Sequence, residues 1–168
     1  EVEHARRYGM IQAIRFRRRL KVVVNELPEK FNDIQVPRLI LQPILENAIY
    51  YGMEAMDDDG IISVRGYQKD EDVFLEISDN GLGMPEEAAA KLLTEGERVR
   101  SRGSGVGLLN VHNRIRLRFG EQYGLQIESF PDEGMTVRIH IPYIPYTEET
   151  CRQLEEGKLP DGKGGRSV

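Results

Sequence analysis

The sequence predicts an α+β protein: a two-layer α/β sandwich in which helices cover one face of a mixed sheet. Strand-like segments follow one another directly at 61–68 and 73–78, and again at 125–130 and 135–142. A doubly wound nucleotide fold would need strict alternation of strand and helix, which this order lacks. An apolar stripe at helical spacing within 37–53 predicts a helix that packs on the sheet.

At the start of the chain, helical spacing predicts a polar helix over 1–18, although Gly9 lowers its propensity. This helix has a sparse apolar face of Val2, Ala5, Met10, Ile11 and Ile14. A short strand is expected at 20–27, ended by Pro28.

The segment 37–53 carries the strongest helical pattern. Its apolar stripe consists of Leu41, Ile44, Leu45, Ala48 and Gly52, and its other side of Pro43, Asn47, Tyr50 and Tyr51. Pro43 is expected near the helix start or at a kink, because an interior proline removes a hydrogen bond.

The second half of the chain predicts strands at 61–68 and 73–78, a helix over 106–119 and a final hairpin. Residues 84–102 are charged and lack apolar periodicity, so we expect a mobile connection there. The polar tail is expected to be poorly ordered or a loose helix. These patterns divide the chain into a linker helix (1–18), one domain (19–145) and a tail (146–168).

Bulk composition restricts the function. The net charge of −5 disfavours a broad nucleic-acid footprint, although a polyphosphate needs only a local site. One cysteine, Cys151, rules out an internal disulfide, and both this and the lack of Cys/His clusters suit a reducing cytoplasm. No apolar run approaches the ~18 residues of a membrane span. We interpret the chain, which starts at Glu1, as a fragment of a longer protein.

Three short segments carry residues suited to chemistry. In the first, Glu46 and Asn47 interrupt an apolar helix, and the amide oxygen of Asn47 could bind a hard cation such as Mg²⁺. Alternatively, both are solvated surface residues. In the second, strand parity directs Asp79 to the buried face, where an amine such as that of adenine would be a suitable donor. Gly81 and Gly83 follow Asp79 in this segment. The alternative to an adenine site is an ordinary turn after a strand.

The third segment, Gly103-Ser104-Gly105-Val106-Gly107-Leu108, runs directly into a helix. Glycines at a helix N-terminus expose backbone N–H groups that suit phosphate, and a flexible loop is the alternative. It is neither a Walker A loop nor a Rossmann fingerprint.

Taken in this order, the segments resemble the N, G1 and G2 boxes of the superfamily of gyrase, Hsp90-type chaperones, histidine kinases and MutL. Residues 39–49 and 105–115 are similar to the consensus of LytS/YesM-type sensor histidine kinases. The resemblance covers about residues 1–142. It implies a Bergerat-type ATP-binding fold with a lid over 84–102.

Carried over by position, the resemblance implies that Asn47 binds Mg²⁺, that Glu46 assists near the metal, and that Asp79 binds the adenine amino group. The other residues implied in the ATP site are Tyr51, Gly81, Gly83, Met84, Gly103, Ser104, Gly105, Val106, Gly107 and Leu108.

The sequence departs from the family at two positions. Tyr50 stands where a basic residue is common, so an arginine from the lid (Arg98, Arg100 or Arg102) would supply that charge. Met135 stands where the relatives often carry Thr, and Thr136 points to the other strand face.

Pro43 occupies the position at which ATPase members carry a catalytic Glu. A neutral imidazole is already nucleophilic, so a histidine acceptor fits better than water or serine. We expect none of His4, His112 and His140 to be that acceptor.

The sequence therefore predicts the catalytic domain of a two-component sensor histidine kinase, with ATP and Mg²⁺ as cofactors. Its expected partners are the histidine-bearing dimerisation domain of the same protein, which would be a homodimer, and a response regulator, but no nucleic acid. It would be the cytoplasmic domain of a membrane-anchored sensor. The alternatives are a non-catalytic nucleotide sensor whose ATP-ordered lid gates a partner, and a purely structural interaction domain.

Overall fold

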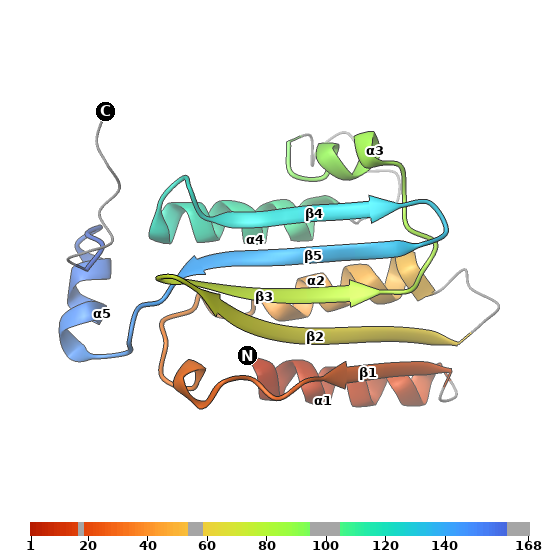
Figure 1. Cartoon of the computed structure of the whole chain (residues 1–168), viewed down its shortest axis with the longest axis horizontal. Helices are drawn as coiled ribbons and strands as arrows, with labels where there is room; N and C mark the ends of the chain where they lie inside the picture. The colour runs from red at the N-terminus through yellow and green to blue at the C-terminus, as the bar shows by residue number, and fades with distance from the viewer. Residues whose placement is uncertain (17–18, 54–58, 95–104, 161–168) are drawn as a thin grey trace.

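Figure 1 shows a computed structural model of the chain, which describes residues 1–16, 19–53, 59–94 and 105–160. These residues form a five-stranded sheet in the order β1-β2-β3-β5-β4. β1 (Leu20–Val24) pairs with β2 (Gly60–Lys69) in parallel. β3 (Asp72–Asp79), β4 (Gly124–Phe130) and β5 (Gly134–Pro142) complete the sheet through antiparallel pairs. The predicted mixed sheet is confirmed.

Three helices cover one face of the sheet, as predicted: α1 (Val2–Arg15), α2 (Leu41–Asn47) and α4 (Gly105–Phe119). A 3₁₀ turn, η1 (Glu29–Phe31), precedes α2, and a π-helix, η2 (Ala48–Met53), continues it. Pro43 is the third residue of α2, where its missing N–H would have no partner within the helix. It therefore lies near the helix start, as expected.

The core lies between this helical layer and the sheet. Alternate residues of β3 face it, namely Val73, Leu75 and Ile77, and all three are buried. They meet buried side chains of the helices, among them Leu41, Ile44, Leu45, Leu108, Val111 and Ile115. The two-residue period of the strand thus places its last residue, Asp79, on the same covered face.

The apolar face predicted for α1 is wrong in part. Ala5 is buried, whereas Met10, Ile11 and Ile14 are exposed. Gly9 is buried against β1, where an added Cβ would lie 2.8 Å from Val22 Cβ. The glycine that weakens the helix by propensity is therefore the residue that allows its close approach to the sheet.

One further expectation needs correction, and for the tail the structure decides between the two alternatives left open. The first part of the expected mobile connection contains α3 (Glu86–Lys91), whose Ala89, with the following Leu92, is buried. A helix of six residues with so few buried side chains is too short to give a periodic apolar signal in the sequence. In the tail, the helix alternative is confirmed over α5 (Glu148–Glu155), which begins with a Thr147–Thr150 capping box and buries Leu154. The remainder of the expected lid, 95–102, lies outside the described residues.

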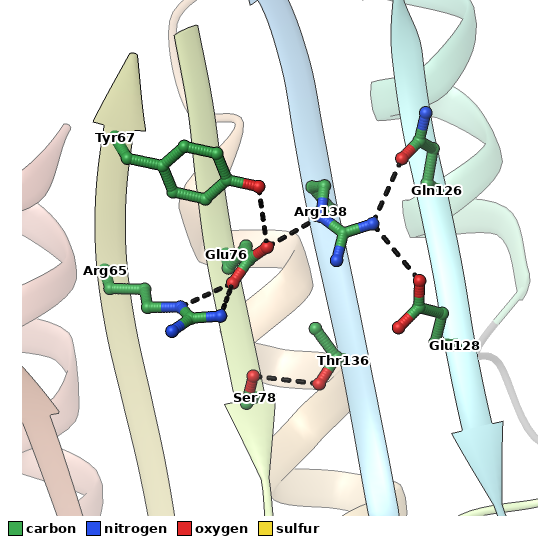
Figure 2. Close-up of polar contacts among 8 residues, drawn as sticks. All are labelled: Arg65, Tyr67, Glu76, Ser78, Gln126, Glu128, Thr136 and Arg138. Carbon is green, nitrogen blue, oxygen red and sulfur yellow. Dashed lines mark hydrogen bonds and ion pairs between the residues drawn. The ribbon is translucent and has the colours of Figure 1, made fainter. Parts of the chain in front are cut away.

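The other face of the sheet carries a buried carboxylate. Glu76 is 1% exposed although it lies on the face opposite the helices, because Arg65, Tyr67 and Arg138 surround it (Figure 2). Arg138 Nε donates to Glu76 Oε1 at 2.7 Å, and Tyr67 donates to the same oxygen at 3.0 Å. Arg65 Nε donates to Oε2 at 2.5 Å.

This arrangement sets the charge state of Glu76. Burial raises the pKa of its carboxyl, but hydrogen bonds from Arg138, then Arg65, more than offset this, so the net pKa is lowered. The resulting stability is present above the unfolded pKa and is lost as pH falls through the lower folded pKa.

We expect Glu76→Ala to lower the free energy of unfolding by about 2–3 kcal/mol, because three donors lose a charged acceptor. The matched control is Glu128→Ala, which removes a 60% exposed carboxylate that also contacts Arg138, at 3.2 Å. It should cost less than about 1 kcal/mol. Urea unfolding at pH 7 measures both; equal losses would contradict the assignment of Glu76 as the centre of the network.

Candidate functional site

Asp79 ends β3 with its side chain on the helix-covered face, as the strand parity predicted. Its Oδ1 accepts backbone N–H bonds from Gly81 at 2.9 Å and from Met135 at 3.3 Å. Burial raises the pKa of the Asp79 carboxyl, although these two bonds act in the opposite direction. Among the described residues no hydrogen bond occupies Oδ2, which leaves one acceptor for a donor from a ligand.

Hydrogen bonds connect the loop after Asp79 to the β4–β5 turn. The Met84 N–H donates to Ser129 Oγ at 2.9 Å, and Ser129 Oγ donates to the Gly134 carbonyl at 3.1 Å. Gly83 has φ +57, and an added Cβ would lie 2.1 Å from the Phe130 carbonyl oxygen. Gly83 is therefore required both by its backbone angle and by the close approach of the turn.

We expect Gly83→Ala to lower the free energy of unfolding by about 2–4 kcal/mol, because the turn must move to admit a methyl group. Gly157→Ala is a matched control, since Gly157 has φ +72 but no atom within 4 Å of an added Cβ. That control should lose only about 1 kcal/mol, the cost of the backbone angle alone. Chemical denaturation measures the free energy of unfolding of both variants. Similar losses in the two would mean that the β4–β5 turn moves to admit the methyl group at no energetic cost.

Asn47 ends α2 and is 7% exposed, so its interpretation as a solvated surface residue is wrong. Its Nδ2 lies 3.7 Å from Met135 Sδ, and Met135 pairs with Asp79 in the sheet. Met135 thus stands between the two residues and brings the first two predicted segments together.

The Asn47 side chain suits a hard cation. Its amide oxygen is a neutral oxygen ligand of the kind that Mg²⁺ prefers, and its Nδ2 is directed at Met135 Sδ. The described residues hold no group of three or more His, Cys, Asp or Glu that could bind a metal. Mg²⁺ in nucleotide sites is commonly held by one or two side chains together with the phosphates, and Asn47 fits that pattern.

Glu46 lies apart from these residues. Its side chain is exposed on the side of α2 that faces α1, and Gln42 Nε2 donates to its Oε1 at 2.7 Å. The structure therefore does not bring Glu46 to Asp79 or to the Met135 side of Asn47. The contact with Gln42 escaped the sequence reasoning, although the i, i+4 spacing of the two residues could have indicated it.

The third segment begins α4. Gly105, Val106, Gly107 and Leu108 are the first four residues of this helix, so their N–H groups lack partners within it. Leu108 is fully buried and anchors the turn. α4 ends beside the start of β4, so it begins towards the end of the sheet at which β3 ends (Figure 1). Gly103, Ser104, the three lid arginines and the Tyr51 side chain lie outside the described residues.

The histidines make structural contacts. His112 Nδ1 accepts the Leu125 N–H at 2.9 Å, and burial lowers the pKa of this histidine. His140 stacks on Phe74 with ring centroids 4.6 Å apart, and its Nε2 lies 2.7 Å from Asp72 Oδ2. Through these contacts, both residues contribute to the packing of the sheet.

Comparison with known proteins now adds to this geometry. The family of histidine kinase-, DNA gyrase B- and HSP90-like ATPases matches residues 32–145. The chain belongs to this family. Membership implies a site for ATP, and residues 32–145 contain all three of the segments described above.

Curated relatives of the chain include sensor histidine kinase YesM of Bacillus subtilis, 35% identical over 143 residues. Sensor histidine kinase BtsS of Escherichia coli is 33% identical over 144 residues. These alignments cover 84% and 85% of this chain but 23% of each relative. The chain thus spans about a quarter of the length of the relatives it matches.

Solved structures confirm the fold. The mycobacterial sensor histidine kinase MprB superposes with a TM-score of 0.58 at 21% identity, covering 85% of this chain and 95% of that one. The catalytic domain of histidine kinase ThkA gives 0.58 at 19% identity, covering 85% and 92%. In the described part of the chain, no helix has the length and apolar character needed to cross a bilayer.

Proposed function

We propose that this chain is the ATP-binding, catalytic part of a sensor histidine kinase, which transfers the γ-phosphoryl group of ATP to a histidine outside residues 1–168. The observation that carries the proposal is the convergence of Asp79, Asn47 and the glycine-rich start of α4 at one end of the sheet. The names of the relatives favour a kinase over a non-catalytic nucleotide sensor.

In this proposal Asp79 Oδ2 accepts a hydrogen bond from the exocyclic amine of adenine. Gly81 and Gly83 let the loop backbone approach the base, and Met84 and Tyr51 flank it. The backbone N–H groups from Gly103 through Leu108, including Ser104, bind the phosphates, where the helix N-terminus favours negative charge. The Asn47 amide oxygen binds Mg²⁺, and Glu46 acts near the metal or its waters.

The reaction breaks the bond between the γ-phosphorus and its bridging oxygen, so that ADP leaves, and forms a bond from phosphorus to an imidazole nitrogen. The attacking nitrogen uses its lone pair, and the proton on the other ring nitrogen is released to water or a neighbouring base. Positioning would supply much of the rate, since phosphoryl transfer needs little covalent help from the protein, and a Mg²⁺ ion held by Asn47 would supply charge neutralisation. Pro43, which has no titratable group, is compatible with a histidine acceptor.

The partners follow from this function. Residues 1–18 would end the dimerisation domain that carries the acceptor histidine, in a homodimeric full-length protein. A response regulator would then take the phosphoryl group. The site would face the cytoplasm, where ATP is available, in a sensor anchored to the membrane.

Isothermal calorimetry tests the nucleotide site: the chain should bind Mg-ATP with a dissociation constant below about 1 mM. The kinase step is tested with the full-length protein and γ-labelled ATP, where an acid-labile phosphohistidine should form outside residues 1–168. Failure to bind Mg-ATP would refute the whole proposal. Normal binding without phosphohistidine in the full-length protein would support the non-catalytic nucleotide sensor instead.

A further inference from the structure

α1 and α2 contact each other through a row of polar side chains with a constant spacing. The Glu1 carboxylate accepts the backbone N–H groups of Leu39 and Ile40 at 2.5 and 2.9 Å. His4 Nε2 lies 2.6 Å from Gln42 Oε1. The pairs Glu1–Leu39 and His4–Gln42 are each separated by 38 residues, as expected where α1 and α2, with the residues just before each helix, run parallel in register.

A third residue of α1 completes the row. Tyr8 lies near Glu46, whose charge contributes, after burial, to a raised pKa of the Tyr8 phenol. Glu1, His4 and Tyr8 follow the i, i+3, i+7 spacing of one helix face. One face of α1 is therefore directed at the segment that ends in Asn47.

The side-chain amide of Gln42 can bridge the two helices in only one of its two orientations. Its Nε2 donates to Glu46 Oε1 at 2.7 Å, so its Oε1 must face His4, whose Nε2–H donates to it. Turning the amide over would place its oxygen against the Glu46 carboxylate, which repels it. The charge of Glu46 thus fixes the orientation of two successive hydrogen bonds between α1 and α2: His4 donates to Gln42, and Gln42 donates to Glu46.

Gln42 lies five residues before Asn47, within the same two turns of helix. Together with its continuation η2, α2 forms a short helical segment at 41–53, which has little stability of its own and takes its position from its contacts. The Glu1 carboxylate holds the start of α2, and the His4–Gln42–Glu46 chain holds its exposed side. The position of α1 therefore influences where α2 presents Asn47.

We propose that Gln42 is a positioning residue, which links Glu46 to His4 so that docking of α1 fixes the presentation of Asn47 to Mg²⁺. This inference rests on the proposed function and adds to it a route by which movement of the linker helix changes nucleotide binding. It gives Glu46 a role in holding α2 that is independent of any role near the metal.

The experiment compares ATP affinity in Mg²⁺ and in EDTA by calorimetry, using the whole 168-residue chain. Gln42→Glu replaces the donor to Glu46 by a like charge, whereas Gln42→Lys keeps a donor and loses the acceptor for His4. Both should weaken Mg-ATP binding about fivefold and leave binding in EDTA unchanged. Arg7→Ala, on the outward side of α1, is the control and should match the wild type in both conditions.

Two further variants test the link to α1. His4→Ala should reproduce the defect of Gln42→Lys, and the double variant should be no worse than either one, because both break the same contact. His4→Gln, which restores a donor, should recover affinity. Amide exchange at Ile40 and Leu41 gives a readout without ligand and should accelerate in the Gln42 variants.

The outcomes are distinct. An unchanged ratio of affinities in Mg²⁺ and EDTA for both Gln42 variants would overturn the positioning role and leave the nucleotide site intact. A parallel loss of affinity in both conditions, together with a lower melting temperature, would also overturn it, since that is the result of a merely structural contact. Absence of ATP binding by the wild-type chain would refute the proposed function and this inference with it.

Discussion

Asp79→Asn is expected to weaken ATP binding about 100-fold while the free energy of unfolding stays the same or rises. The amide oxygen of the substituted side chain can still accept the N–H bonds that Oδ1 accepts from Gly81 and Met135. Its NH₂ group then faces the ligand and opposes the amino group of adenine, donor against donor. Removing a buried charge meanwhile relieves its desolvation. Calorimetry and urea unfolding measure the two effects.

Inosine triphosphate provides the matched ligand control, because it carries a carbonyl oxygen in place of the adenine amine. The wild-type chain should prefer ATP strongly, and Asp79→Asn should reduce or reverse that preference, since its NH₂ can donate to the carbonyl. An equal loss of affinity for both nucleotides would show that Asp79 holds the pocket together and does not contact the base.

The raised pKa of Asp79 also predicts the pH dependence of stability. Because the native state holds this proton more tightly, unfolding releases it, and the wild-type free energy of unfolding falls as pH rises through the folded pKa. Asp79→Asn lacks this titration. Its stability relative to the wild type should therefore be greater at pH 7 than at pH 4, measured by urea unfolding at both values; a constant difference would contradict a buried, ionised Asp79.

Asn47→Ala is expected to remove the contribution of Mg²⁺ to ATP affinity and to slow phosphoryl transfer in the full-length protein about 100-fold. The variant should bind ATP equally in Mg²⁺ and in EDTA, because the amide oxygen proposed as the metal ligand is gone. Asn47→Asp, which keeps an oxygen there, should retain the Mg²⁺ dependence.

The control for this pair is Asn113→Ala, which removes an exposed amide from α4. It should leave both the Mg²⁺ dependence and the transfer rate unchanged. A full Mg²⁺ effect in Asn47→Ala would exclude Asn47 as the metal ligand, whatever the transfer rate.

The strand pattern and the side of the sheet on which Asp79 lies could both be predicted from the order of residues along the chain. The alternation of Val73, Leu75 and Ile77 settles that side, because adjacent residues of a strand point to opposite faces. Local pattern left Pro43 either near the start of its helix or at a kink, because proline disrupts a helix interior, and the structure has it near the start. Motif order predicted the family, which the match over residues 32–145 confirms.

How these segments meet could not be predicted and follows from the folded structure. The contact of Asn47 with Met135 joins residues 88 positions apart, and no local pattern encodes it. The same holds for Gly9 against Val22, where helix propensity gave no sign of the close packing that needs a glycine. Adjacent residues also took different directions: Asn47 turned into the core towards Met135, and Glu46 towards α1. Local sequence sets the angle between neighbouring side chains of a helix, whereas packing against the rest of the chain decides which of them faces the site.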